Sequence, residues 1–193
     1  MKYLLALFLA SPLFAADFVL YSTTPSTPAY PAPVAKTGQT NSYAANDDGA
    51  LKAGVAWPAT RFVIQTDTNV VLDALTGLMW ARNFISSGTN IWTNQINYCE
   101  GLTLGGFSDW RMPSVFELAS LMDLSLVSPT IQSGHPFSNV PIGVTDYFWT
   151  GSTYMAAPTR SWVYIFTTGA GSAGAYSTKA TSLNYVLPVR GPQ

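Results

Sequence analysis

The stretch Asp109-Trp110-Arg111-Met112-Pro113-Ser114, which continues through Val115 to Asp123, indicates most clearly how this chain folds. Ser114 and Glu117 have the spacing of a capping box, in which two side chains satisfy free backbone amides in the first turn of a helix. Pro113 lies just before this start, where the missing proline N–H has little effect. The stretch therefore predicts a corner at which an extended segment leads directly into a capped helix.

The predicted helix has one apolar face. Apolar residues fall at the intervals i, i+3, i+4 and i+7 that place side chains on one side of a helix, namely Val115, Leu118, Ala119 and Met122. In the extended segment before the helix, the guanidinium of Arg111 is expected to stack on the indole of Trp110 and to pair with Asp109. Nothing in this stretch is typical of a catalytic site.

Three segments before the corner are typical of β-strands. Arg61–Thr66 and Val70–Asp73 are rich in β-forming residues, and a turn signal, Asp67-Thr68-Asn69, separates them. A second turn follows and leads into Leu78–Arg82. Together the three segments predict an antiparallel meander.

A further helix is predicted over Trp92–Leu102, because Trp92, Ile96 and Cys99 fall on one helical face. After the corner comes Ser125–Gly143, a segment rich in proline and glycine. Compact domains rarely keep irregular connections of this length. The pattern predicts two helices joined to short strands by extensive loops.

The last third of the chain is nearly free of charge. Tyr147–Thr150, Ser161–Phe166 and Tyr185–Arg190 predict strands. Trp162–Phe166 is apolar on both faces, so one face is expected in the core and the other is either covered or a contact surface. Thr167–Leu183 consists mainly of Gly, Ala, Ser and Thr, a composition shared with adaptable binding loops. The class predicted from these elements is α+β.

The first residues are predicted to direct export. Met1–Ala15 has a basic start and a short apolar run that ends in small residues, as in a signal peptide, and it is shorter than the ~20 residues of a membrane span. Export would place the chain at the cell surface, in the periplasm or outside the cell. Ala16–Ala35 contains four prolines and is predicted to be an extended arm. Its apolar residues Phe18–Tyr21 are expected to form an edge strand or to contact a partner. Residues 36–193 are predicted to form the domain.

Charge and composition exclude several classes of site. The net charge of −1 gives no basic surface for nucleic acid. Cys99 is the only cysteine, so it cannot form an intrachain disulfide and is expected to be a small buried apolar residue. Asp47-Asp48-Gly49 suits an ordinary turn or, as an alternative, a Ca²⁺ ligand pair near Asp47 and Asp48. The full calcium-loop pattern is absent, so no cofactor is expected.

Six short motifs occur in order along the chain: Lys36–Thr40, Gly54–Pro58, Thr76–Trp80, Asp109–Pro113, Ser133–Phe137 and Val186–Gly191. Together they resemble the Lcl C-terminal-domain-like family, which is named for the C-terminal domain of a bacterial collagen-like adhesin. The resemblance spans residues 36–193. It implies a C-type-lectin-like fold, in which two helices flank small antiparallel sheets with extensive irregular loops. The named member binds sulfated glycans, and similar proteins include the variable proteins of diversity-generating retroelements.

In those variable proteins, a constant framework holds diversified surface positions that bind ligand. The resemblance implies a framework in the last third at Trp149, Trp162, Lys179 and Val186–Arg190, which includes Arg190. Trp80, Trp110 and Arg111 are further expected framework residues. The display positions implied for ligand binding are Phe148, Tyr154, Arg160, Tyr164, Phe166, Tyr176 and Leu183.

The function favoured by the sequence is an exported, non-enzymatic binding module, such as an adhesin or a diversified variable protein. Its aromatic, small-residue C-terminal loops would recognise a protein or glycan ligand. The alternative is a structural subunit of a cell-surface assembly or filament, a homo-oligomer packed through the N-terminal arm. Catalysis is disfavoured, because His135 is the only histidine and has no neighbouring Ser or Cys nucleophile in the sequence.

Overall fold

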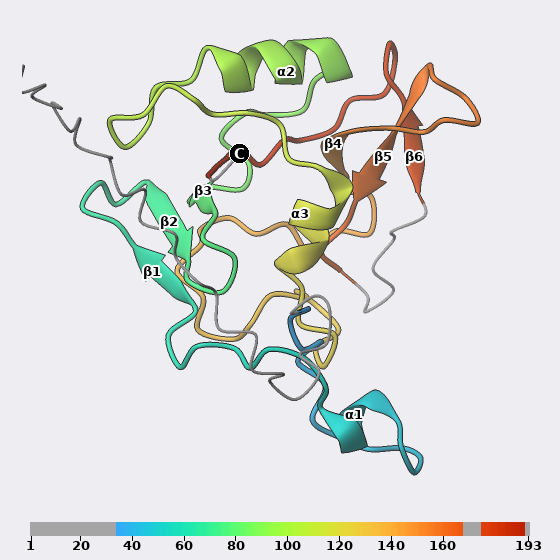
Figure 1. Ribbon diagram of the computed structural model, residues 1–193. Coiled ribbons are helices and arrows are strands. Elements are labelled where there is room, and N and C mark those ends of the chain that lie inside the picture. Colours follow the sequence, from blue (N-terminus) through green and yellow to red (C-terminus); the bar gives the residue numbers. More distant parts are fainter. Residues whose placement is uncertain (1–33, 168–174, 192–193) are drawn as a thin grey trace, which may run out of the picture. The chain divides into compact units, whose positions relative to one another are not determined.

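The computed structural model of the chain describes residues 34–167 and 175–191, all within the structural unit Pro33–Gln193. The predicted signal peptide, the predicted arm as far as residue 33 and the segment 168–174 lie outside the described residues. The described part combines helices with two small antiparallel sheets (Figure 1), so the predicted α+β class is confirmed. The elements are α1 (Asp48–Leu51), β1 (Phe62–Ile64), β2 (Val70–Asp73), β3 (Met79–Ala81), α2 (Trp92–Glu100), α3 (Val115–Ser120), β4 (Phe148–Thr153), β5 (Arg160–Tyr164), β6 (Tyr176–Thr178) and β7 (Val189–Arg190).

The first sheet has the order β1-β2-β3-β7 and contains the predicted meander. Val63 pairs with Leu72 across β1 and β2, and the last strand, β7, joins the sheet where Val189 pairs with Trp80. The extended segment of the corner also reaches this sheet, because the N–H of Arg111 donates to the carbonyl of Val189 at 2.9 Å. The sheet therefore joins the meander, the corner and the last strand of the chain.

The second sheet has the order β4-β5-β6, with a register shift between Trp149 and Thr153. Strand β6 lies where the sequence predicted a binding loop, so that prediction is wrong for Tyr176–Thr178. Three mostly small polar residues carry no hydrophobic alternation, and only pairing with β5 makes them a strand. Conversely, the predicted strand Tyr185–Arg190 is regular only in β7.

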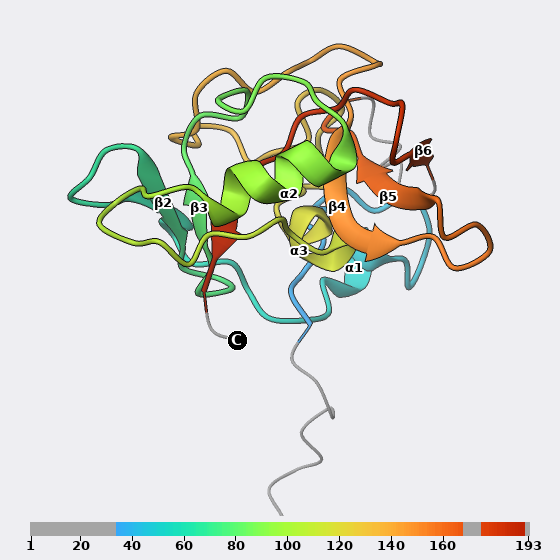
Figure 2. The ribbon, with the colours of Figure 1, turned by 90° about the horizontal axis from the view of Figure 1, so that it is seen from above.

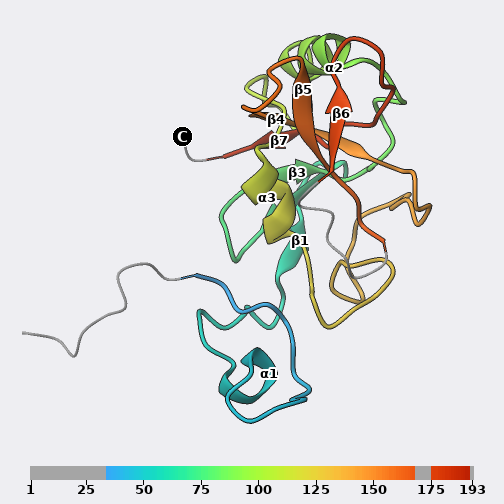
Figure 3. The same ribbon diagram turned by 90° about the vertical axis from the view of Figure 1, so that its right-hand side faces the viewer.

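The capping box that begins α3 is confirmed. The N–H of Glu117 donates to the Ser114 hydroxyl at 3.2 Å, and the N–H of Ser114 donates to the Glu117 carboxylate at 2.7 Å. Leu118 is fully buried, and α3 lies against β4 and β5 (Figure 3). The helix ends at Ser120, earlier than predicted, because the following amide of Leu121 already bonds three residues back, to Leu118.

The predicted ion pair of the corner is wrong. Arg111 donates to Glu117 at 2.8 Å, whereas Asp109 accepts from Arg190 at 2.7 Å. Glu117 points back toward the start of α3 as part of the capping box, and this orientation also places its carboxylate within reach of Arg111. The guanidinium of Arg190 lies 3.6 Å from the centre of the Phe107 ring. The two arginines of the framework therefore connect the corner to α3 and to β7.

Glu117 gives the stability of the fold a pH dependence. Burial acts to raise the pKa of its carboxyl group, but hydrogen bonds from Arg111 and Ser114 outweigh burial and lower that pKa. A carboxyl group with a lowered folded-state pKa stabilises the fold above its unfolded pKa of about 4.5, and this stabilisation is lost as pH falls through the folded value. Urea unfolding of the wild type and Glu117→Gln should therefore differ most near neutral pH and converge in acid. A difference that stays constant with pH would contradict this account.

Two apolar clusters fill the domain. The larger one includes Trp80, Phe84 and Leu118 between the first sheet, α3 and the second sheet. The smaller one joins Cys99 of α2 to Trp149 and Val163 of the second sheet. Figure 2 shows α2 beside this sheet. The predicted apolar face of α2 is thus confirmed, since Trp92 and Ile96 also pack against this cluster. None of the helices in the described residues has the length and apolar character needed to cross a membrane.

Candidate ligand-binding surface

The two faces of the β4-β5-β6 sheet have different surroundings. Successive residues of a strand point to opposite faces, so Ser161 and Val163 share one face while Arg160 and Trp162 share the other. Val163 lies in the cluster with α2, which covers its face. Tyr176 pairs with Trp162 across β5 and β6 and therefore lies on the second face with it.

On this second face, four side chains form a continuous row, here called the aromatic ladder: Tyr154, Arg160, Trp162 and Tyr176. The rings of Tyr154 and Tyr176 are stacked, with centroids 4.5 Å apart and planes at 7°. Trp162 meets Tyr154 edge to face at 5.1 Å and 79°. The guanidinium of Arg160 lies 4.8 Å from the centre of the Tyr176 ring. Such ring pairs stabilise one another by about 0.5–1.5 kcal/mol beyond the area they bury, so the row is ordered before any ligand arrives.

The ladder is accessible to solvent. Tyr176 is 42% exposed, and Tyr154, Arg160 and Trp162 are partly exposed. Three of the predicted display positions, Tyr154, Arg160 and Tyr176, are therefore brought together in one surface. The fourth member, Trp162, was expected in the framework, but its alternation with Arg160 along β5 places it on the same face.

The prediction that three further residues are displayed on the surface is wrong, because their side chains are buried. Phe148 and Phe166 are completely inaccessible and meet Phe84 edge to face at 5.5 Å and 5.1 Å. Tyr164 continues the ladder side of β5 but is only 2% exposed, because α3 and the residues after it cover this end of the strand. Its hydroxyl donates to the sulfur of Met122, and burial raises its pKa to about 12.

Leu183, the remaining predicted display position, lies apart from the ladder. Leu183 is 60% exposed in the loop after β6, and it makes none of the ring contacts that define the ladder. Trp80, Trp110 and Trp149, which were predicted to belong to the framework, are buried. Lys179 donates to the Thr153 hydroxyl at 2.8 Å and lies over the ring of Trp92, on the face that α2 covers.

The sequence points to one family. Residues 69–190 match the family model of the Lcl C-terminal domain, which is more than half of the chain. The chain belongs to this family. The match includes the whole aromatic ladder and every strand from β2 to β7. The chain matches no curated protein and no solved structure.

The two side chains considered for catalysis are removed from solvent in this Lcl C-terminal domain: Cys99 is buried and His135 is half-buried. Burial raises the pKa of the Cys99 thiol to about 12, with the charge of Glu100 acting in the same direction, so the thiol is protonated at neutral pH. Burial lowers the pKa of His135, whose ring packs against Phe137. Among the described residues no three His, Cys, Asp or Glu side chains are grouped as metal ligands.

The aspartates considered for Ca²⁺ have structural roles before the matched range. Asp47 is the N-cap of α1, where its carboxylate accepts from the amides of Tyr43, Ala44 and Ala50. The carboxylate of Asp48 accepts from the Thr37 hydroxyl. The Asp-Gly signal therefore begins a short helix, where the sequence favoured a simple turn.

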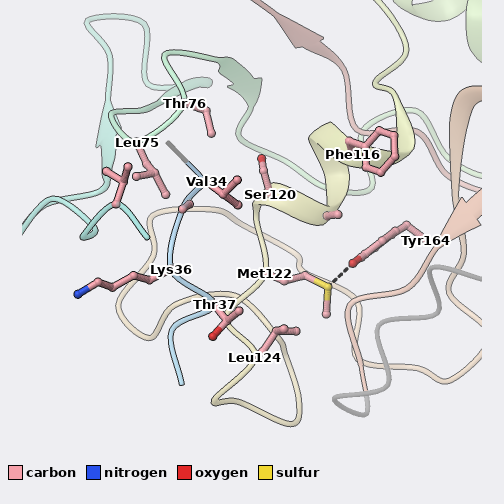
Figure 4. Close-up of a pocket in the computed structure, with 13 residues that line it drawn as sticks. Val34, Lys36, Thr37, Leu75, Thr76, Phe116, Ser120, Met122, Leu124 and Tyr164 are labelled. Carbon is pink, nitrogen blue, oxygen red and sulfur yellow. Dashed lines mark hydrogen bonds between the residues drawn. The ribbon is translucent and has the colours of Figure 1, made fainter. Parts of the chain in front are cut away.

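The chain also has an apolar groove of about 730 Å³ beside α3 (Figure 4). Tyr164 and Met122 lie at its side, joined by their hydrogen bond, and Phe116 of α3 is 83% exposed at its edge. The groove is lined in part by residues that precede the family match. Its lining is Val34, Ala35, Lys36, Thr37, Val55, Leu75, Thr76, Phe116, Ala119, Ser120, Met122, Leu124 and Tyr164.

Proposed function

We propose that this Lcl C-terminal domain protein is an exported, non-enzymatic binding module, and that it holds a protein or glycan ligand on the aromatic ladder. The single observation that carries the proposal is the stacked, partly exposed row of Tyr154, Tyr176 and Trp162 with Arg160 at its end. Tyr, Trp and Arg are the residues most enriched among those that dominate binding energy at protein surfaces.

The order of the ladder supports recognition. Tyr and Trp have few rotatable bonds, so they supply a large contact area at a low cost in conformational entropy. Here the rings also restrain one another, which reduces the entropy that binding would otherwise remove. The face opposite the ladder is anchored by α2 through Val163 and Cys99, so the sheet presents the rings from a fixed support.

Export and the absence of catalysis are parts of the same proposal. Export rests on the signal-peptide pattern of Met1–Ala15. The non-enzymatic character is supported by the protonated, buried thiol of Cys99 and by the packing of His135 against Phe137. Neither side chain belongs to the ladder, which contains only aromatic rings and one guanidinium.

Tyr176→Ala is expected to weaken ligand binding about tenfold or more, because it removes the ring that contacts both Tyr154 and Arg160. The exported chain would be tested on arrays of purified glycans and purified proteins, and each hit would be measured by titration. Tyr43→Ala is the matched control, since Tyr43 is 83% exposed and precedes the family match. Binding that Tyr176→Ala leaves unchanged, in variants with the melting temperature of the wild type, would refute the assignment to the ladder.

A further inference from the structure

Among the residues that the structure describes, Arg160 differs from the other arginines because its N–H donors have no acceptor. Arg61, Arg111 and Arg190 are each paired with a carboxylate. Arg82 donates to the carbonyls of Pro136 and Thr68. Among the described residues, the guanidinium of Arg160 has neither an ion-pair partner nor a hydrogen-bond acceptor, and its contact is the ring of Tyr176. It therefore holds a planar set of N–H donors ready at the end of the ladder.

The sequence around Arg160 leaves its charge unbalanced. From Tyr147 to the C-terminus the chain has three basic residues and no Asp or Glu. Lys179 is held over Trp92 by its bond to Thr153, and Arg190 is paired with Asp109. Within the described part of this segment, Arg160 is thus the cation that remains available. The complementary group on a ligand is an anion, best a carboxylate that accepts two parallel N–H bonds.

The ring geometry distinguishes between kinds of ligand. Tyr154 covers one face of the Tyr176 ring at 4.5 Å. The guanidinium of Arg160 lies 4.8 Å from the centre of the same ring. Two groups therefore already crowd the Tyr176 ring, which favours a ligand that packs against its edge and its hydroxyl over a sugar that stacks on an open ring face. Side chains of a protein can pack against ring edges, and the Tyr, Trp and Arg composition is that of a protein-binding hot spot.

We infer that the ligand of the aromatic ladder is a protein, and that this protein presents an Asp or Glu carboxylate to Arg160. The inference rests on the proposed function, because it names the partner of the same surface. The carboxylate would accept two N–H bonds from the guanidinium, while apolar atoms beside it would pack against the edges of Tyr176 and Trp162. Arg160 would then select acidic partners, and the rings would supply most of the contact area.

The test uses a displayed library of random, disulfide-constrained peptides as the protein-like probe and polygalacturonate and dextran as acidic and neutral glycan probes. The exported chain would be the target, and the enriched peptides would be titrated against the wild type, Arg160→Gln and Arg160→Lys. Lys52→Gln, which removes an exposed lysine before the family match, is the control. The enriched peptides are expected to share an Asp or Glu. Arg160→Gln should weaken their binding about tenfold or more. Arg160→Lys should restore only part of this loss, because lysine keeps the charge but lacks the planar fork.

A double-mutant cycle separates a direct contact from a general effect of charge. Changing the peptide acid to its amide should cost affinity with the wild type and very little further affinity with Arg160→Gln. Should Arg160→Gln fail to fold, the same cycle with Arg160→Lys decides, together with the loss of affinity as salt is raised. Binding of polygalacturonate that is lost in Arg160→Gln, or a library that yields no binding peptides, would overturn the inference. Peptides that need Tyr176 but lack an acid would overturn it too and leave the proposed function standing, whereas peptides that need neither residue would refute both.

Discussion

Asp73→Ala is expected to lower the free energy of unfolding by about 3–5 kcal/mol, because it leaves a buried cation without its partner. Arg61 and Asp73 are both completely inaccessible, and Arg61 donates to Asp73 through Nε at 3.0 Å and through Nη2 at 2.8 Å. Without the carboxylate, Arg61 would keep the carbonyl of Ser120 and the rings of Trp57 and Phe62, each centred 4.6 Å away. These contacts do not neutralise its charge.

The carboxylate of Asp73 also organises the turn that joins β2 to β3. It accepts from the amide of Leu75 and from the hydroxyl of Thr76, each at 3.0 Å. The substitution therefore removes the charge partner of Arg61 and the cap of this turn together, which places the effect among the large ones for a single residue.

Urea unfolding followed by tryptophan fluorescence would measure the loss, with Asp109→Ala as the matched control. Asp109 is also paired with an arginine, Arg190, but its side chain is 54% exposed. Water can solvate the charge of Arg190 when Asp109 is removed, so the control is expected to change stability far less. Equal effects of the two substitutions would show that burial of the Arg61–Asp73 pair does not determine its contribution.

The parts of the fold that the sequence predicts best are those fixed by local rules. The Ser114 and Glu117 capping box depends on residues three apart, and the structure has both of its hydrogen bonds. The meander of β1, β2 and β3 follows from short strands separated by turn residues. The buried face of α2 follows from helical spacing. In each case the interacting residues are close in the chain, so a one-dimensional pattern contains the information.

The parts that the sequence does not predict depend on which element covers which. The alternation along β5 puts Arg160, Trp162 and Tyr164 on one face, but only the position of α3 makes Tyr164 buried while Trp162 stays accessible. The stacking of Tyr154 on Tyr176 joins a residue after β4 to a strand that has no hydrophobic pattern. The pairing of Arg190 with Asp109 joins residues at distant points of the chain. Such contacts arise from tertiary packing, so no local sequence motif predicts them.

Phe166→Ala is expected to lower the free energy of unfolding by about 3–5 kcal/mol, the usual range for removing a buried phenylalanine ring. Phe166 is completely inaccessible and meets Phe84 at 5.1 Å and Phe148 at 5.3 Å, in both cases edge to face. Alanine would leave a cavity at the centre of the larger apolar cluster, and neighbouring rings cannot close it without losing their own contacts. Any loss of ligand binding at a fixed temperature should follow the loss of folded protein.

Phe116→Ala is the matched control, since Phe116 is 83% exposed on α3 and should change stability by no more than about 0.5 kcal/mol. Chemical unfolding gives the stabilities, and titration of the folded fraction with a ligand selected on the ladder gives the affinities. The folded fraction of Phe166→Ala is expected to bind with wild-type affinity, in contrast to Tyr176→Ala. A stable Phe166→Ala variant with weakened binding would show that this ring contacts the ligand. Phe166 would then be a ligand-binding position, as the resemblance implied. A destabilised variant that binds normally separates the two roles that aromatic residues have in this domain, since Phe166 supports the sheet and Tyr176 meets the ligand.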